Sequence, residues 1–149
     1  MKNTSWGNPT WIFLHTMVEK INKNKFDENK EIIIDIIKSI CFNLPCPECS
    51  KHSIEFLNTV HFQNVKKKED LIEILYVFHN QVNKNLRKPE FHEENLETYK
   101  SNDITEKLNI FIKSYSMRLP SALMNLSFRR SQVIKKITEY FSKNKELFK

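Results

Sequence analysis

The chain has 149 residues, of which 40% are apolar and 11% aromatic, so it can bury a core and is not intrinsically disordered. A single glycine argues against β-hairpins and excludes glycine-rich phosphate loops. The formal net charge is +6, and residues 101–149 carry all of the excess, because residues 1–100 contain as many acidic as basic side chains. We therefore expect a helical protein whose last third is basic.

The basic residues of 101–149 have two interpretations. A solvated helix face explains them most simply. Contact with an acidic protein, a nucleic acid or a membrane surface is the alternative, and such binding would weaken with added salt. Of these partners, we do not expect nucleic acid.

The three cysteines, Cys41, Cys46 and Cys49, are too few and too clustered for the disulfide framework of a small secreted protein. The apolar run over residues 32–37 is short and contains Asp35, and no basic segment followed by an apolar stretch opens the chain. These features predict a soluble, intracellular protein without a membrane span.

Apolar spacing predicts four helices in the first ninety residues. The first follows Pro9, the second is rich in isoleucine and ends near Pro45, the third begins at Pro47, and the fourth ends before Pro89. A short fifth segment is expected over residues 91–99. Two amphipathic helices then follow, separated at Pro120, with apolar stripes over residues 104–115 and 133–141.

Cys46-Pro47-Glu48-Cys49 places two sulfurs at the predicted start of the third helix. Two intervening residues allow a disulfide, and the positive end of a helix favours a thiolate. Cys46, at the mouth of the helix, is then the expected exposed partner, and Cys49, one turn inside, the buried one. No thioredoxin-like β-α-β pattern precedes the pair, so a bound cofactor is a suitable electron acceptor.

The same region allows a second interpretation, a helical zinc-binding adaptor with a Cys3His site. Cys41, Cys46, Cys49 and His52 have compatible ligand types and spacings. Cys41, however, falls on the apolar stripe of the second helix, where a thiol packs as a small hydrophobe. A zinc site would also leave the polar face of the fourth helix unexplained, where His79 and Asn83 are four residues apart. We therefore predict no metal.

Three motifs together resemble a known family. They are Trp6-Gly7 with residues 11–15, the Cys46–Cys49 motif with His52, and residues 79–91. Their order and separations are similar to those of the Erv/ALR flavin-linked sulfhydryl oxidases, and most closely to the short viral members. The resemblance implies an all-α fold, a four-helix bundle with a short fifth helix over residues 1–100. Residues 101–149 would form a basic helical C-terminal extension.

The resemblance also implies FAD as the cofactor. The FAD-binding residues that it implies come from the first, third and fourth helices and the segment after them: Gly7, Trp11, His15, Glu48, Cys49, His52, Tyr76, His79, Asn80, Val82, Asn83, Lys88 and Phe91. Of the catalytic pair, Cys46 would meet the substrate and Cys49 would lie beside the flavin.

The reaction implied by this family is oxidation of two thiols by O2, giving a disulfide and H2O2. Its substrate would be a protein dithiol or a thioredoxin-like redox carrier. The additional cysteine pair of many cellular members is absent from this chain, so electrons would enter directly at Cys46. Family members are commonly homodimers, and a viral member would act in the host cytoplasm or the virion. The alternatives stay a zinc-binding adaptor and a basic interaction module.

Overall fold

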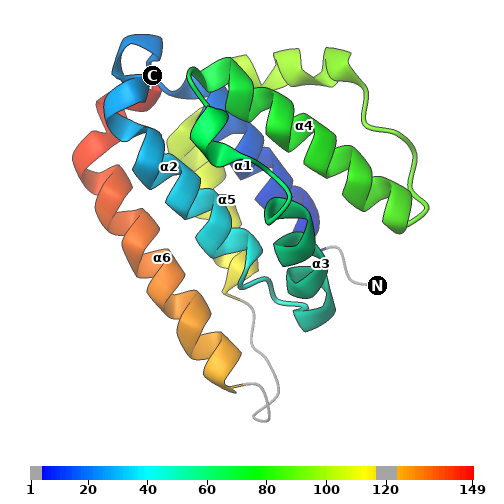
Figure 1. Ribbon diagram of the computed structural model, residues 1–149. Coiled ribbons are helices and arrows are strands. Elements are labelled where there is room, and N and C mark those ends of the chain that lie inside the picture. Colours follow the sequence, from blue (N-terminus) through cyan, green and yellow to red (C-terminus); the bar gives the residue numbers. More distant parts are fainter. Residues whose placement is uncertain (1–4, 117–123) are drawn as a thin grey trace.

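The computed structural model describes residues 5–116 and 124–149, and all regular structure in these residues is helical. Four helices correspond to the predicted bundle: α1 (Gly7–Lys20), α2 (Phe26–Cys41), α3 (Pro47–Leu57) and α4 (Lys68–Asn85). They are followed by α5 (Ile104–Tyr115) and α6 (Met124–Asn144), and Figure 1 shows α6 running alongside α2. The predicted all-α class is confirmed. The break predicted at Pro120 lies outside the described residues.

Short 3₁₀ segments lie between several of the helices and after α6 in the described residues. They comprise η1 (Lys23–Lys25), η2 (Phe62–Asn64), η3 (Glu93–Ser101) and η5 (Lys145–Phe148). The short fifth segment predicted over residues 91–99 is therefore η3, a 3₁₀ rather than an α-helix. It packs against α1.

The second helix ends at Cys41, four residues before Pro45. Leu44 precedes a proline and so disfavours helical backbone angles, and residues 42–45 form a turn instead. The third helix begins at Pro47 as predicted, with Cys46 as its N-cap in an extended conformation. The early end of α2 thus leaves a turn before Cys46, which lies at the N-cap of α3.

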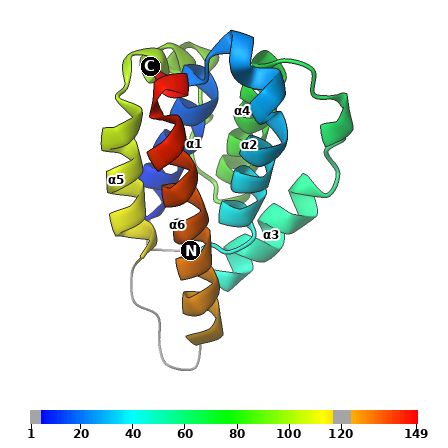
Figure 2. The ribbon, with the colours of Figure 1, turned by 90° about the vertical axis from the view of Figure 1, so that its left-hand side faces the viewer.

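The core is built around α1, whose Phe13, Leu14, Met17 and Val18 are all inaccessible or nearly so. Phe13 stacks on Phe111 of α5, with ring centroids 4.9 Å apart, and meets the edge of Phe141 of α6. Figure 2 shows α6 passing in front of α1 between α5 and α2. The extension therefore shares one hydrophobic core with the bundle. A domain boundary at residue 100 stays a prediction.

Polar contacts fix α6 against α2 along its length. The Lys136 ammonium lies 2.8 Å from the Asp35 carboxylate, and the Tyr140 hydroxyl donates to the Asn29 side-chain oxygen at 2.9 Å.

No helix in the described part of the chain has the length and apolar character to cross a membrane.

Candidate active site

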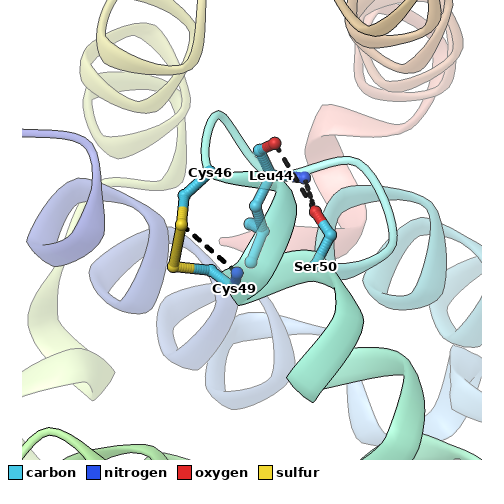
Figure 3. Close-up of a disulfide and its surroundings, with 4 residues drawn as sticks. All are labelled: Leu44, Cys46, Cys49 and Ser50. Atoms are coloured by element: carbon cyan, nitrogen blue, oxygen red, sulfur yellow. Dashed lines mark hydrogen bonds between the residues drawn. A yellow bond between two sulfur atoms is a disulfide. The ribbon is translucent and has the colours of Figure 1, made fainter. Parts of the chain in front are cut away.

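Cys46 and Cys49 form a disulfide at the start of α3, with their Cα atoms 5.2 Å apart (Figure 3). The Cys49 backbone N–H donates to the Cys46 sulfur at 3.2 Å, so the N-cap position of α3 is filled by a sulfur atom. Beside the pair, the Ser50 hydroxyl accepts a hydrogen bond of 2.7 Å from the Leu44 N–H. The disulfide is thus held by the first turn of a helix whose amide dipoles favour negative charge.

A cavity of about 250 Å³ lies between α1, α3 and α4, and Cys49 is part of its wall. Its walls are mainly apolar and aromatic, with a few polar groups, as is typical of cofactor sites. The lining residues are Trp6, Gly7, Asn8, Thr10, Trp11, Leu14, Cys41, Leu44, Cys49, His52, Ser53, Phe78, His79, Val82, Asn83, Asn85, Leu86, Lys88 and Pro89.

The two sulfurs differ in what they face. Both cysteines are half-buried, so the expectation of one exposed and one buried residue is wrong as a statement about solvent access. Both cysteines pack against the hydrophobic core, which covers part of each. Only Cys49 lines the cavity, however, whereas Cys46 lies outside it.

An aromatic stack runs along one side of the cavity. The rings of Trp11 and His79 lie face to face, with centroids 4.1 Å apart and planes 6° apart. Phe91 covers the same imidazole at 4.3 Å. His79 is therefore sandwiched between a residue of α1 and a residue of the segment after α4, which joins these two parts of the site.

Two asparagines of α4 hold that segment in place. The Asn80 amide donates to the Phe91 carbonyl at 3.0 Å and accepts from the Phe91 N–H at 2.7 Å. Asn83 donates to the Pro89 carbonyl at 3.2 Å. Both the oxygen and the nitrogen of the Asn80 side-chain amide are thus hydrogen-bonded within the chain. Asn80 therefore shapes the site by holding the segment after α4 in place.

His15, which is buried, contacts His79, the half-buried middle ring of the stack. His15 Nε2 and His79 Nδ1 are 3.0 Å apart, and His15 Nδ1 has no hydrogen-bond partner in the described part of the chain. Burial, and secondarily the proximity of His79, lowers the pKa of His15 to about 3. Burial, and secondarily the Lys88 ammonium, lowers the pKa of His79 to about 4. Both imidazoles are therefore neutral at pH 7.

The structure brings most of the predicted site residues to the cavity. Those in its wall are Gly7, Trp11, Cys49, His52, His79, Val82, Asn83 and Lys88. His15 and Phe91 lie in the layer behind it, stacked at 5.2 Å, and Tyr76 lies beside Phe91 at a centroid distance of 6.1 Å. Glu48 is exposed in the first turn of α3. The binding roles of all these residues stay predictions.

Several wall residues were not predicted as site residues. Trp6, Leu14, Leu44 and Phe78 lie on the apolar stripes or beside the first motif, where a core role accounts for them equally well. Cys41 was expected in the core. It is buried there, which raises the pKa of its thiol to about 12, and it also borders the cavity. The pairing of Trp6 with Gly7 was the signal that could have identified Trp6.

The zinc interpretation finds no support. The Cys46 and Cys49 sulfurs are bonded to each other, and no group of three metal-ligating side chains occurs within residues 5–116 and 124–149.

The fold and the site define a class of all-helical proteins with a disulfide at a helix mouth beside an apolar, aromatic cavity. Within that class, residues 8–108 match the Erv1 / Alr family. The match covers two thirds of the chain, and the chain therefore belongs to this family. The resemblance drawn from the three motifs is confirmed.

One curated relative comes from Invertebrate iridescent virus 3, and its name describes a candidate FAD-linked sulfhydryl oxidase, 096R. It is 30% identical to this chain over 86 residues, which cover 57% of this chain and 58% of the relative. The match thus spans less than two thirds of that protein. No solved structure matches the chain significantly.

Proposed function

We propose that this protein is an FAD-dependent thiol oxidase that forms disulfide bonds in protein substrates. The main support for this function is that the two cysteines of one disulfide lie in different positions relative to the cavity. Cys49 borders the cavity, whereas Cys46 lies outside it, where a substrate thiol could approach. Family membership and the viral relative support the same activity.

The residues of the cavity suit a flavin nucleotide. Its apolar walls fit a planar heterocycle, while His79 and Asn83 offer hydrogen-bonding groups and Lys88 a positive charge for a pyrophosphate. Trp11, His52, His79, Asn83 and Lys88 would hold the nucleotide. FAD bound there would accept two electrons from the cysteine pair and pass them to O2, giving H2O2.

The cysteines divide the thiol chemistry between them. A substrate thiolate attacks the Cys46 sulfur, and Cys49 leaves as a thiolate at the cavity wall. A second substrate thiolate then attacks the substrate sulfur of the mixed disulfide and releases Cys46. The substrate dithiol has then lost two electrons and two protons, and both cysteines are reduced. The Cys49 N–H, aimed at the Cys46 sulfur, stabilises the departing Cys46 thiolate.

The partners follow from this scheme. The substrate is a protein dithiol or a thioredoxin-like carrier that reaches Cys46 directly. The protein is expected to act as a homodimer, because the family resemblance implies one.

The visible spectrum of protein refolded or expressed with FAD available tests the cofactor assignment. We expect a yellow protein, with FAD recovered after denaturation, that consumes oxygen when dithiothreitol is added. Colourless, inactive protein with a native circular dichroism spectrum would refute the proposal.

Substitution of each cysteine tests whether the disulfide carries the reaction. Cys49→Ser and Cys46→Ser should each lower the turnover number with dithiothreitol at least 100-fold while FAD stays bound, because either change removes the disulfide. Ser131→Ala, at an exposed serine of α6, is the control and should keep full activity. Undiminished turnover in Cys49→Ser would contradict its place beside the cofactor.

A further inference from the structure

The turn that carries Cys46 is held by a residue from outside the bundle. The Tyr115 hydroxyl, at the end of α5, donates to the Asn43 carbonyl at 2.6 Å. Tyr115 has no exposed surface, and it lies beyond residues 8–108, which match the family. The extension therefore contacts the chain three residues before the redox pair.

Tyr115 is itself fixed by α6. The Arg130 side chain is buried, and its Nε donates to the Tyr115 carbonyl at 3.0 Å. The Arg130 guanidinium also lies 5.8 Å from the centre of the Tyr115 ring. Figure 1 shows that α6 begins at the same end of the molecule as α3. Both helices of the extension thus contribute to the position of this hydroxyl.

The turn is held from its other side by α3. The Leu44 N–H donates to the Ser50 hydroxyl at 2.7 Å (Figure 3). The Ser50 N–H in turn donates to the Cys46 carbonyl at 3.0 Å. Only Leu44 and Pro45 separate Asn43 from Cys46, and the proline ring fixes its own φ. These hydrogen bonds and the proline ring restrict the backbone from Asn43 to Cys46.

We propose that Tyr115 is a positioning residue for the redox pair, because its hydroxyl keeps the reduced Cys46 thiol within bonding reach of Cys49. The inference rests on the proposed function, since it concerns the disulfide that would be reduced and re-formed in each cycle. Restricting the turn raises the effective concentration of one thiol at the other, which favours the disulfide. Tyr115 would contact neither the substrate nor the cofactor. It acts indirectly, by holding the turn that precedes Cys46.

The substitution Tyr115→Phe removes the hydroxyl and keeps the ring. We expect the equilibrium constant for closing the disulfide to fall about three- to tenfold, which raises the reduction potential by about 14 to 30 mV. In turnover with dithiothreitol, kcat and KM should fall together while kcat/KM stays the same, because re-formation of the disulfide is slowed and its attack by substrate is not.

The potential is measured in full-length protein equilibrated with mixtures of reduced and oxidised dithiothreitol. The thiols are trapped under denaturing acid conditions and counted by mass. Cys41 contributes one constant thiol in this assay, because it is free in both states.

Tyr140→Phe is the matched control. It removes a hydroxyl that also bonds to the α2 region, through Asn29 and far along the sequence from the cysteines. We expect a similar loss of thermal stability in both variants and a shifted potential in Tyr115→Phe alone. An unchanged potential in folded Tyr115→Phe, or an equal shift in both variants, would overturn the proposal.

A second measurement covers the case in which Tyr115→Phe does not fold. In the parent protein reduced to the dithiol, the amide of Leu44 should still exchange slowly with solvent, because Tyr115 and Ser50 hold the turn. Fast exchange there would also overturn the proposal. Neither measurement requires FAD or oxygen, so failure of the oxidase assay and failure of this inference are separate results.

Discussion

His15 is fully buried in a position where it must stay neutral. Its pKa is lowered to about 3 by burial, whereas an unfolded histidine has a pKa near 6.5. The unfolded chain therefore binds a proton that the folded chain does not. The contribution of neutral His15 to the free energy of unfolding is present above pH 6.5, and it is lost progressively as the pH falls from 6.5 towards 3.

We expect the free energy of unfolding to fall by about 2 kcal/mol between pH 7 and pH 5 because of His15 alone. Urea unfolding at several pH values measures this. His15→Gln should lower stability at pH 7 but flatten the dependence on pH. The exposed His92 provides the comparison, and His92→Gln should leave the slope unchanged. An equal slope in His15→Gln and the parent protein would show that another group is responsible.

At the level of single residues, the sequence motifs indicated which residues lie at the cavity better than they indicated what each side chain does there. Trp11, His79 and Lys88, which the motifs predicted to contact the cofactor, line the cavity, and their binding roles stay predictions. Asn80 was expected to face the ligand, yet its amide is paired with the backbone of Phe91. Sequence spacing indicates on which face of a helix a side chain lies. The hydrogen-bond partner of that side chain depends on where the segment after the helix passes, which the spacing does not indicate.

The end of α4 shows how one element shapes the site. The N–H groups of Arg87 and Lys88 donate to the carbonyls of Lys84 and Asn83, which is the hydrogen-bonding pattern of a Schellman motif. Arg87 has a left-handed φ of 57°, where glycine is normally preferred. This turn brings Lys88 and Pro89 back to the cavity wall. The sequence predicted that the helix ends before Pro89, but it gave no sign of this reversal.

Arg87→Gly should therefore stabilise the protein by about 0.5 to 1 kcal/mol, because glycine adopts a left-handed φ without steric cost. Thermal unfolding, followed by circular dichroism, measures the increase in Tm. Arg87→Ala keeps a β-carbon and is the control, which should not gain stability. A lower Tm in Arg87→Gly would mean that the arginine side chain stabilises the fold by more than its left-handed φ destabilises it.

On the scale of the whole molecule, the extension is part of the core. Phe111, Tyr115, Phe141 and Phe148 are all buried, and Phe13 of α1 packs between two of them. The Asn22 N–H also donates to the Leu147 carbonyl at 2.6 Å. Sequence periodicity predicted the helices of residues 101–149 and their apolar stripes. It could not predict which surface those stripes cover, because that depends on contacts more than ninety residues apart.

A chain ending at residue 102 should consequently fail to fold stably. Each large aromatic side chain removed from a core costs about 3 to 5 kcal/mol, and four such losses exceed the usual stability of a domain. Circular dichroism and urea unfolding of the truncated chain measure this. The control replaces the exposed Lys135 and Lys143 by Gln, which lowers the positive charge of the extension without changing its core. Cooperative unfolding of the truncated chain would favour an independent domain in residues 1–100.

Trp6 and Trp11 both border the cavity, and they are the two tryptophans of the chain. All of the indole fluorescence of this protein therefore originates at the candidate site, and one of the two emitters lies flat against an imidazole. Any molecule that enters the cavity changes the surroundings of both emitters at once. The unmodified protein thus carries its own optical probe of occupancy, with no background from the rest of the fold.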